Sequence, residues 1–213
     1  MASFSADDWV GAAYRRFNEG GLAAVRVEAV ARDLGATKGS FYWHFADRAA
    51  LVNAVMERWE RSETDFVIDL VERAGTPEER LAALYDVIVD RMGERGGERT
   101  LYLDAAPESV DAVVARVTER RVAYVAALLH DAGVDDDEAR RRGAAVVAAV
   151  IGFQQLAAGG WRAGPAVDTH ELTATVLGMS LSGVHGRHAA RHADEAEPEG
   201  AGVQPDGTSP DAR

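Results

Sequence analysis

The run Thr37–Phe45 gathers side chains whose chemistry suits contact with a nucleic acid. It places a hydroxyl, a lysine, a bare glycine backbone and three rings with polar tips on about two turns of predicted helix. Lys38 is long enough to reach a base edge or a phosphate, and Thr37 can cap the helix or contact a phosphate. Gly39 leaves the backbone open to close approach. An enzyme core rarely crowds these groups together, whereas a helix that lies in a DNA groove needs this mixture.

The residues just before this run predict the element that positions it. One apolar helix face recurs at helical spacing at Val27, Val30, Ala31 and Leu34. Gly35 is expected to end that helix. A short helix, a glycine-containing turn and a second short helix form a helix-turn-helix, whose second helix enters the major groove. Phe41 and Phe45, four residues apart, are expected to face the core, so that Gly39 and Trp43 point away from it.

These elements resemble the DNA-binding domain of TetR/AcrR-type transcriptional repressors over residues from about 5 to 52. The matching segments are Phe17–Gly21, Val30–Gly35, Thr37–Phe45 and Asp47–Arg48. The resemblance implies that Tyr42, Trp43 and His44 touch the DNA backbone and the wall of the groove. Beyond these segments, the chain resembles the family only in the number and length of its helices.

Two positions depart from the family pattern. Many members carry a threonine pair where this chain has Val25-Arg26, and a lysine where Arg48 stands. Both arginines can contact phosphate, although with a different geometry. The expected DNA-contacting residues therefore surround the helix-turn-helix and are Arg26, Thr37, Lys38, Gly39, Ser40, Tyr42, Trp43, His44 and Arg48. The alternative is that the rings merely fill the interior of a small domain.

The composition narrows the class of protein. The net charge is −12, yet residues 1–50 carry six basic and six acidic side chains, so the whole excess lies beyond residue 50. An acidic body would repel DNA and orient the neutral end toward it, which argues against a non-specific nucleic-acid coat protein. The absence of cysteine excludes disulfides and thiolate metal sites. With no basic leader and no long apolar run, a cytoplasmic location is expected.

The remaining pattern is helical, with no strand alternation. A long helix is expected from an Asp47 cap to about Ala74, and a new helix after a Thr76 cap that Glu79 completes. Further helices are expected over 99–105, from Pro107 to Gly133, from Asp135 to Gly159 and from Asp168 to about His188. The predicted fold is all-α, with a three-helix helix-turn-helix domain over 1–47, a helical effector-binding and dimerisation domain over 48–190, and a disordered acidic tail over 191–213.

The resemblance implies an effector site among the helices of the second domain. The candidates are its few large aromatic side chains and two others, namely Trp59, Phe66, Tyr85, Met92, Tyr102, Tyr124, Gln154 and Trp161. They suggest a small, mainly hydrophobic organic effector held by polar groups such as Gln154, Tyr85 or Tyr124. The acidic body favours a cation over an anion. Each aromatic residue taken singly is also expected in an ordinary core.

Small residues recur on the last two predicted helices, where they would let helices approach closely. The candidate dimer interface is Ala148, Ile151, Gly152, Ala174, Leu177, Gly178 and Leu181, which would suit a two-fold four-helix arrangement. The alternative is ordinary packing within one chain.

No residue constellation supports catalysis. His185, His188 and His192 have a spacing that could hold a metal, but they fall at a helix end without a cysteine or a fixed carboxylate. We therefore expect no metal, no cofactor and no enzymatic activity. The predicted function is a homodimeric transcriptional repressor that binds a palindromic double-stranded operator and is released by the effector. Two alternatives remain: a DNA-binding regulator without ligand sensing, and an all-α carrier or enzyme for small molecules.

Overall fold

The computed structural model describes residues 4–92, 97–161 and 169–182 of the 213-residue chain. Helices and turns make up these ranges, without a strand, which confirms the all-α fold. In chain order the helices are α1 (Ala6–Gly20), the 3-10 turn η1 (Leu22–Ala24), α2 (Val27–Leu34), α3 (Lys38–Phe41), α4 (Arg48–Glu60), the π-helical segment η2 (Arg61–Asp65), α5 (Phe66–Val71), α6 (Pro77–Met92), α7 (Glu98–Asp104), α8 (Asp111–Asp131), α9 (Asp136–Ala158) and α10 (Thr169–Leu181).

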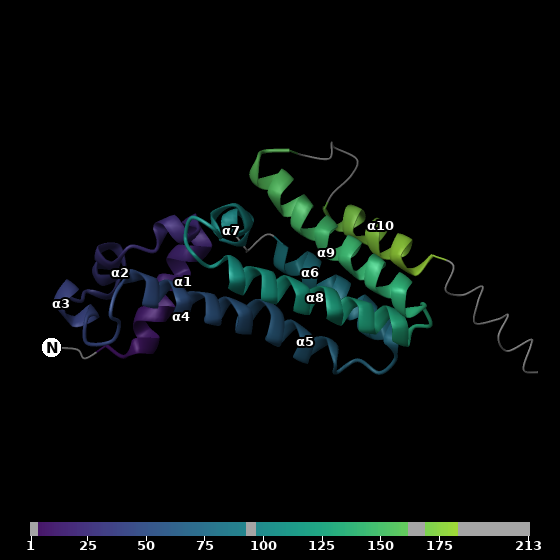
Figure 1. The fold of residues 1–213 in the computed structure, drawn as a ribbon, viewed down its shortest axis with the longest axis horizontal. Helices are drawn as coiled ribbons and strands as arrows, with labels where there is room; N and C mark the ends of the chain where they lie inside the picture. Colours follow the sequence, from purple (N-terminus) through teal and green to yellow (C-terminus); the bar gives the residue numbers. More distant parts are fainter. Residues whose placement is uncertain (1–3, 93–96, 162–168, 183–213) are drawn as a thin grey trace, which may run out of the picture.

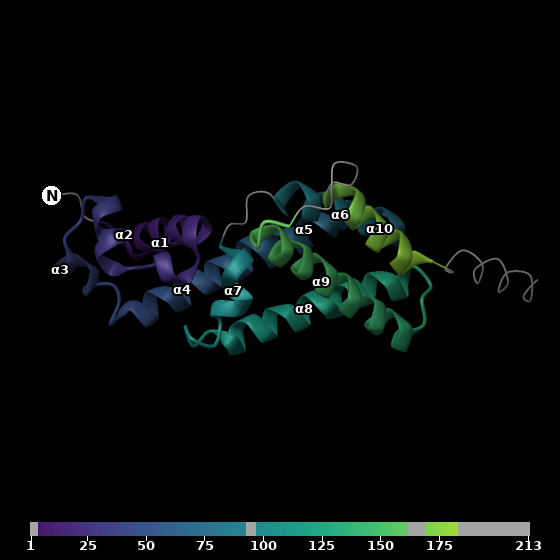
Figure 2. The same ribbon diagram turned by 90° about the horizontal axis from the view of Figure 1, so that it is seen from above.

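The molecule is elongated, with α1, α2 and α3 at one end (Figure 1). We call these elements together with η1 the head, and the helices from α5 onward the body. The helix α4 runs out of the head and continues through η2 into α5. In the body α8 and α9 pack along each other, and α10 packs on α9 and α6 (Figure 2). Within the described ranges, no helix combines the length and the apolar character needed to cross a lipid bilayer.

Local sequence signals set several helix ends, among them the predicted Thr76 cap and the predicted end at Gly35. The hydroxyl of Ser5 accepts from the Asp8 backbone N–H, and the Asp8 carboxylate accepts in return from the Ser5 N–H, which completes a capping box. Thr76 and Glu79 make the same reciprocal pair at the start of α6. Gly35 ends α2 with a φ of 66°, a left-handed conformation that costs glycine little.

The connecting helix differs from the continuous α-helix that the sequence predicts. Asp47 caps it as expected, but the five residues of η2 are π-helical, with the Phe66 N–H donating to the Arg61 carbonyl. This wider turn brings Glu60 and Asp65 to the same side of the helix. Both carboxylates there meet arginines of α8: Glu60 pairs with Arg116 at 2.6 Å, and Asp65 pairs with Arg120.

The start of α8 also differs from the sequence prediction. Pro107 lies in a turn, and the helix begins at Asp111, after Ser109 takes a left-handed φ of 58°. The left-handed residue interrupts any helix that Pro107 could start. The buried Val110 then donates to the Ala105 carbonyl at 2.9 Å and re-enters the core. The predicted end of the last helix near His188 lies outside the described residues, as does the acidic tail.

The head and the body share one hydrophobic cluster. It contains Trp9, Phe17 and Phe41 of the head together with Trp59 of α4 and Leu101 of α7. A second cluster fills the body between α5, α6, α8 and α9. The expected boundary near residue 47 therefore coincides with the start of α4 but not with a gap between cores.

Helix α7 makes an unusually close approach to α1. A Cβ atom added at Gly97 would lie 2.2 Å from the Phe17 carbonyl oxygen, and one added at Gly21 would lie 2.6 Å from the Thr100 hydroxyl. Gly21 also has a φ of 69°, which disfavours any larger residue. Two glycines on opposite sides thus allow α7 to lie directly against the end of α1.

We expect Gly97→Ala to lower the free energy of unfolding by roughly 1–3 kcal/mol, because the new methyl meets backbone that cannot move aside cheaply. Gly11→Ala is the matched control. Its added Cβ would meet only arginine side-chain atoms at 3.9 Å, so helix propensity should stabilise this variant by up to about 1 kcal/mol. Urea unfolding at one protein concentration measures both values. Equal stabilities for the two variants would show that α7 does not rest on α1.

Candidate functional site

The predicted DNA-binding end is built on Phe41, the buried residue of α3. Its ring packs edge-on against Trp9 at a centroid distance of 5.4 Å and stacks on Phe45 at 5.5 Å. The Thr37 hydroxyl caps α3 by accepting from the Ser40 N–H. The regular helix ends at Phe41, shorter than predicted, and turns continue the chain to His44. Phe41 therefore fixes the orientation of the short segment that carries the exposed residues.

Two large aromatic side chains project from this end into solvent. Trp43 is 86% exposed and Tyr42 is 56% exposed, and the edge of Tyr42 contacts Phe41. Exposed rings of this size on one short segment mark an interaction surface. Figure 1 shows α3 at the tip of the molecule, far from the body. This geometry contradicts the alternative that these two rings fill the interior of the domain.

The structure brings most of the predicted contact residues to this tip. The exposed residues there are Arg26, Thr37, Lys38, Gly39, Tyr42, Trp43 and His44. Ser40 is half-buried, and its hydroxyl donates to the Thr37 carbonyl at 2.7 Å, so it is less available to a partner. Arg26 precedes α2 without a side-chain cap, as the missing hydroxyl predicts. Their role in DNA binding stays a prediction.

Lys38 is the only lysine in the chain, because the other 22 basic residues are arginines. Its ammonium lies 2.5 Å from a carboxylate oxygen of Glu28, in the first turn of α2. The hydrogen bond between them raises the pKa of Lys38 and lowers the pKa of Glu28. Glu28 therefore competes with any phosphate for this ammonium, a contact that sequence spacing alone did not reveal.

We expect Glu28→Gln to strengthen DNA binding by roughly two- to fivefold, since it frees Lys38 and removes a negative charge from the tip. The gain should shrink as salt rises, because both charges are exposed. Glu19→Gln is the matched control, because it makes the same charge change near the carboxyl end of α1. Gel shifts at several salt concentrations measure the effect, and equal gains in both variants would assign it to net charge alone.

Arg48, one of the predicted DNA contacts, is held by groups of the chain itself. Its Nε donates to the Val25 carbonyl and its Nη2 to the Leu22 carbonyl, both at 2.7 Å. The remaining guanidinium edge pairs with Glu108, in the turn before α8, at 2.5 Å. Two backbone acceptors and one carboxylate thus occupy the guanidinium. The arginine joins η1, α4 and the body, and its contact with a phosphate stays a prediction.

A cavity of about 70 Å³ lies inside the body between η2, α5, α6, α8 and α9. Nine of its fourteen lining residues are valine, isoleucine or leucine, so its wall is mainly apolar. Polar groups enter it from Glu63 and Thr64 of η2, from Arg121 and Tyr124 of α8, and from Gln154 of α9.

Of the predicted effector residues, Tyr124 and Gln154 line this cavity, and Tyr85 lines a smaller apolar space beside it. The others do not line it. Trp59 is fully buried in the shared cluster and Tyr102 packs against that cluster. Phe66 faces outward under Arg91, and Trp161 is exposed beyond α9. Large aromatic rings are either completely buried in a core, where removal from water stabilises the fold most, or lie on the surface. The residues that remain around the cavity are therefore mainly aliphatic. The Met92 side chain lies outside the described residues.

The predicted dimer residues form two groups on α9 and α10. Ala148, Ala174 and Gly178 are exposed, and a Cβ added at Gly178 or Gly152 would meet nothing within 4 Å. Ile151, Leu177 and Leu181 instead turn inward and pack on the body cluster. These three take part in packing within the chain, Ala148, Ala174 and Gly178 remain exposed, and the dimer interface itself stays a prediction.

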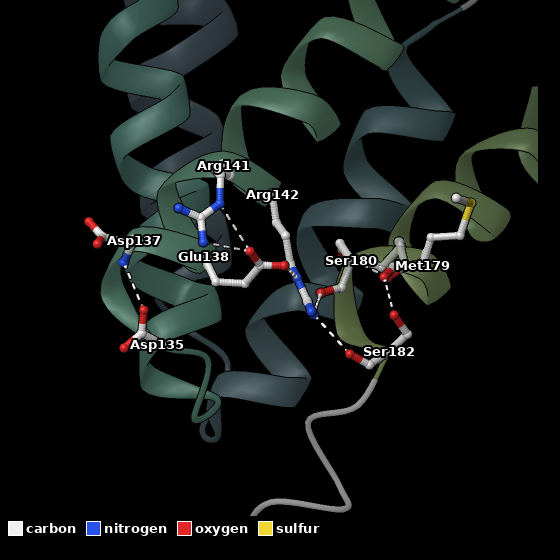
Figure 3. A network of polar contacts seen from close by, with 9 residues as sticks. Asp135, Asp137, Glu138, Arg141, Arg142, Met179, Ser180 and Ser182 are labelled. Atoms are coloured by element: carbon white, nitrogen blue, oxygen red, sulfur yellow. Dashed lines mark hydrogen bonds and ion pairs between the residues drawn. The ribbon is translucent and has the colours of Figure 1, made fainter.

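A polar network holds the two helices of this face together (Figure 3). Arg142 of α9 donates to the carbonyls of Ser180 and Ser182 at the end of α10, at 2.7 and 2.9 Å. Glu138 accepts from Arg142 and from Arg141, which fixes the guanidinium. A cation at the carboxyl end of a helix is favourable.

Within the described residues no cluster of His, Cys, Asp or Glu could hold a metal. The candidate histidines His185, His188 and His192 lie outside these residues.

Comparison with known proteins points to one family. Residues 10–55 match the family described as bacterial regulatory proteins, tetR family. The HTH-type transcriptional regulator AcrR of Shigella flexneri is 30% identical over 78 residues, which span 36% of this chain and only 35% of that relative. The crystal structure of a TetR-like transcriptional regulator from Rhodococcus sp. RHA1 superposes with a TM-score of 0.65 at 17% identity, covering 84% of this chain and 95% of that one.

Proposed function

Because residues 10–55 match the tetR family of bacterial regulatory proteins, we propose that the chain is a transcriptional repressor that binds operator DNA as a homodimer. The observation that carries this proposal is the tip of the head, where the rings of Tyr42 and Trp43 stand in solvent beside the ammonium of Lys38. Exposed rings and a cation at the end of a helix-turn-helix suit a groove and its phosphates.

The proposed dimer places two heads on one operator. The small, exposed residues of α9 and α10 would face their counterparts in a second copy, at the end of the molecule opposite the tip. Two-fold symmetry then requires a palindromic operator. Its half-sites should be read in successive major grooves about 34–36 Å apart, or somewhat further. Repression would follow from occupation of the operator.

The proposed release depends on the connecting helix. Glu63 and Thr64 line the cavity, and the same continuous helix begins at Arg48 in contact with η1 of the head. An effector that binds one conformation of the cavity better than another would therefore shift the spacing of the two heads. Coupling of about 1–3 kcal/mol, or 5–150-fold in affinity, is typical of such linkage.

Selection of genomic fragments bound by the purified chain tests the proposal. We expect recovery of an inverted repeat with a defined half-site spacing. Recovery of unrelated fragments in proportion to their abundance would contradict it.

A regulator without ligand sensing is the second candidate function. A thermal-shift screen of small molecules separates it from the proposed ligand-responsive repressor. If the chain senses no ligand, no compound should both raise the melting temperature and release the operator.

A further inference from the structure

The chemical character of the effector follows from the groups that line the body cavity, provided that the proposed ligand-responsive function holds. Two residues on its wall, Glu63 and Arg121, carry charge. The Glu63 carboxylate accepts from Arg91 at 2.9 Å and from the Tyr14 hydroxyl at 3.2 Å. The negative charge of Glu63 is thus balanced by Arg91, which does not line the cavity.

Arg121 is matched in the same way. Its Nη1 donates to Glu98 at 2.6 Å, its Nε donates to the Thr64 hydroxyl at 3.0 Å, and its guanidinium lies 5.0 Å above the Trp59 ring. A charged ligand would exchange its hydration for a wall whose two charges are already neutralised. Burial of an ion without a new counter-ion is costly. The cavity therefore disfavours anions and cations alike, which differs from the cation expected from the acidic composition.

Gln154 supplies the polar feature that a neutral ligand can use. The residue is 4% exposed, lies on α9 and lines the cavity. Its side-chain carbonyl oxygen is buried and has no hydrogen-bond partner. Tyr124, the other predicted effector residue on this wall, is already engaged, because its hydroxyl donates to Glu72 at 2.8 Å. A buried acceptor without a donor is unfavourable, and a ligand N–H or O–H would satisfy it.

We infer that the cavity binds a neutral, mainly hydrophobic molecule that carries one N–H or O–H donor, and that the Oε1 atom of Gln154 accepts from this donor. The nine aliphatic side chains bury the apolar surface of the ligand without fixing its orientation. The hydrogen bond to Gln154 fixes the orientation. Gln154 is thus the residue that determines specificity. It discriminates a donor-bearing molecule from an equally apolar one without a donor.

Four probes of similar size test this inference on the full chain: 1-naphthol, naphthalene, 1-naphthoate and 1-naphthylmethylammonium. Isothermal titration should show that 1-naphthol binds roughly tenfold more tightly than naphthalene. The anion and the cation should bind more weakly than naphthalene. Tightest binding of either ion, or no binding of any probe, would overturn the inference.

Gln154→Leu should abolish the preference for 1-naphthol over naphthalene, while Gln155→Leu, the same change one residue along on α9 and off the cavity wall, should keep it. Without ligand, Gln154→Leu should melt at or above the temperature of the unaltered chain, because it removes an unsatisfied buried acceptor. A Gln154→Leu chain that remains folded and still prefers 1-naphthol would assign recognition elsewhere.

Operator binding measured in the same samples keeps the two proposals apart. If 1-naphthol binds through Gln154 but the affinity for operator is unchanged, the site is correct and the proposed release by an effector is wrong. If the operator is bound and no probe enters the cavity, the inference about the ligand fails while the DNA-binding function stands.

Discussion

Tyr42→Ala is expected to weaken operator binding by roughly ten- to a hundredfold, and Lys38→Ala by a similar factor. The Tyr42 ring is more than half exposed at the tip and rests edge-on against Phe41, so its removal takes away contact area without opening the core. Loss of Lys38 should also reduce the slope of log affinity against log salt by about two, because the proposed dimer loses one phosphate contact in each protomer.

Gel shifts across a salt series measure both variants, and their helical circular dichroism should match that of the unaltered chain. Phe66→Ala is the matched control for the ring, because Phe66 is 50% exposed but lies on α5 in the body. Wild-type affinity in both Tyr42→Ala and Lys38→Ala would remove α3 from the DNA interface.

Gly178→Arg is expected to produce monomers and to reduce operator affinity by about two to four orders of magnitude. Gly178 is exposed on α10 with open space beside it, so the arginine harms no packing within the chain but would place bulk and charge in the proposed interface. Once the dimer is lost, the second half-site no longer benefits from the effective concentration set by the first. Light scattering and gel shifts measure the two effects.

Ala148→Glu should behave in the same way from the neighbouring helix α9. Its matched control is Ala123→Glu, which makes the same change at an exposed alanine of α8 and should leave both mass and affinity unchanged. A dimer that survives both Gly178→Arg and Ala148→Glu would place the interface on another face of the body.

Features set by neighbouring residues could be predicted from the sequence. The Thr76–Glu79 capping box and the glycine that ends α2 depend on partners within four positions, and both lie where the pattern placed them. The burial of Phe41 followed from helical spacing in the same way. Local hydrogen bonds and periodicity therefore determined most helix boundaries and the exposed face of the tip.

Features set by partners that lie far away in the sequence could not be predicted from it. The π-helical segment η2 accompanies ion pairs between α4–η2 and arginines more than fifty positions away in α8. Arg48 has the reach to contact phosphate, but the carbonyls of Leu22 and Val25 and the carboxylate of Glu108 are brought to it by tertiary packing. Spacing along the chain carries no record of either arrangement.

The cavity shows a further limit. Aromatic residues were the natural candidates, yet the wall consists mainly of valine and isoleucine. One signal was present in the sequence: Val146, Val147, Val150 and Ile151 recur at helical spacing on α9, one turn before Gln154. An aliphatic stripe that ends in an amide is compatible with a core as well as with a cavity. Only the packing of α8 against α9 distinguishes the two.

The single lysine of the chain lies at the tip, so chemical modification of this side chain can report whether the tip is covered. Amine-directed acylation can modify just one side chain, Lys38, and a trypsin digest of the acylated protein releases it within residues 33–48 because the modified lysine is not cleaved. The yield of this peptide relative to peptides 33–38 and 39–48, which come from unmodified chains, would report what fraction of the tips is shielded in a mixture of protein, DNA and candidate effector. Occupancy of the operator could thus be followed by mass spectrometry without any engineered residue.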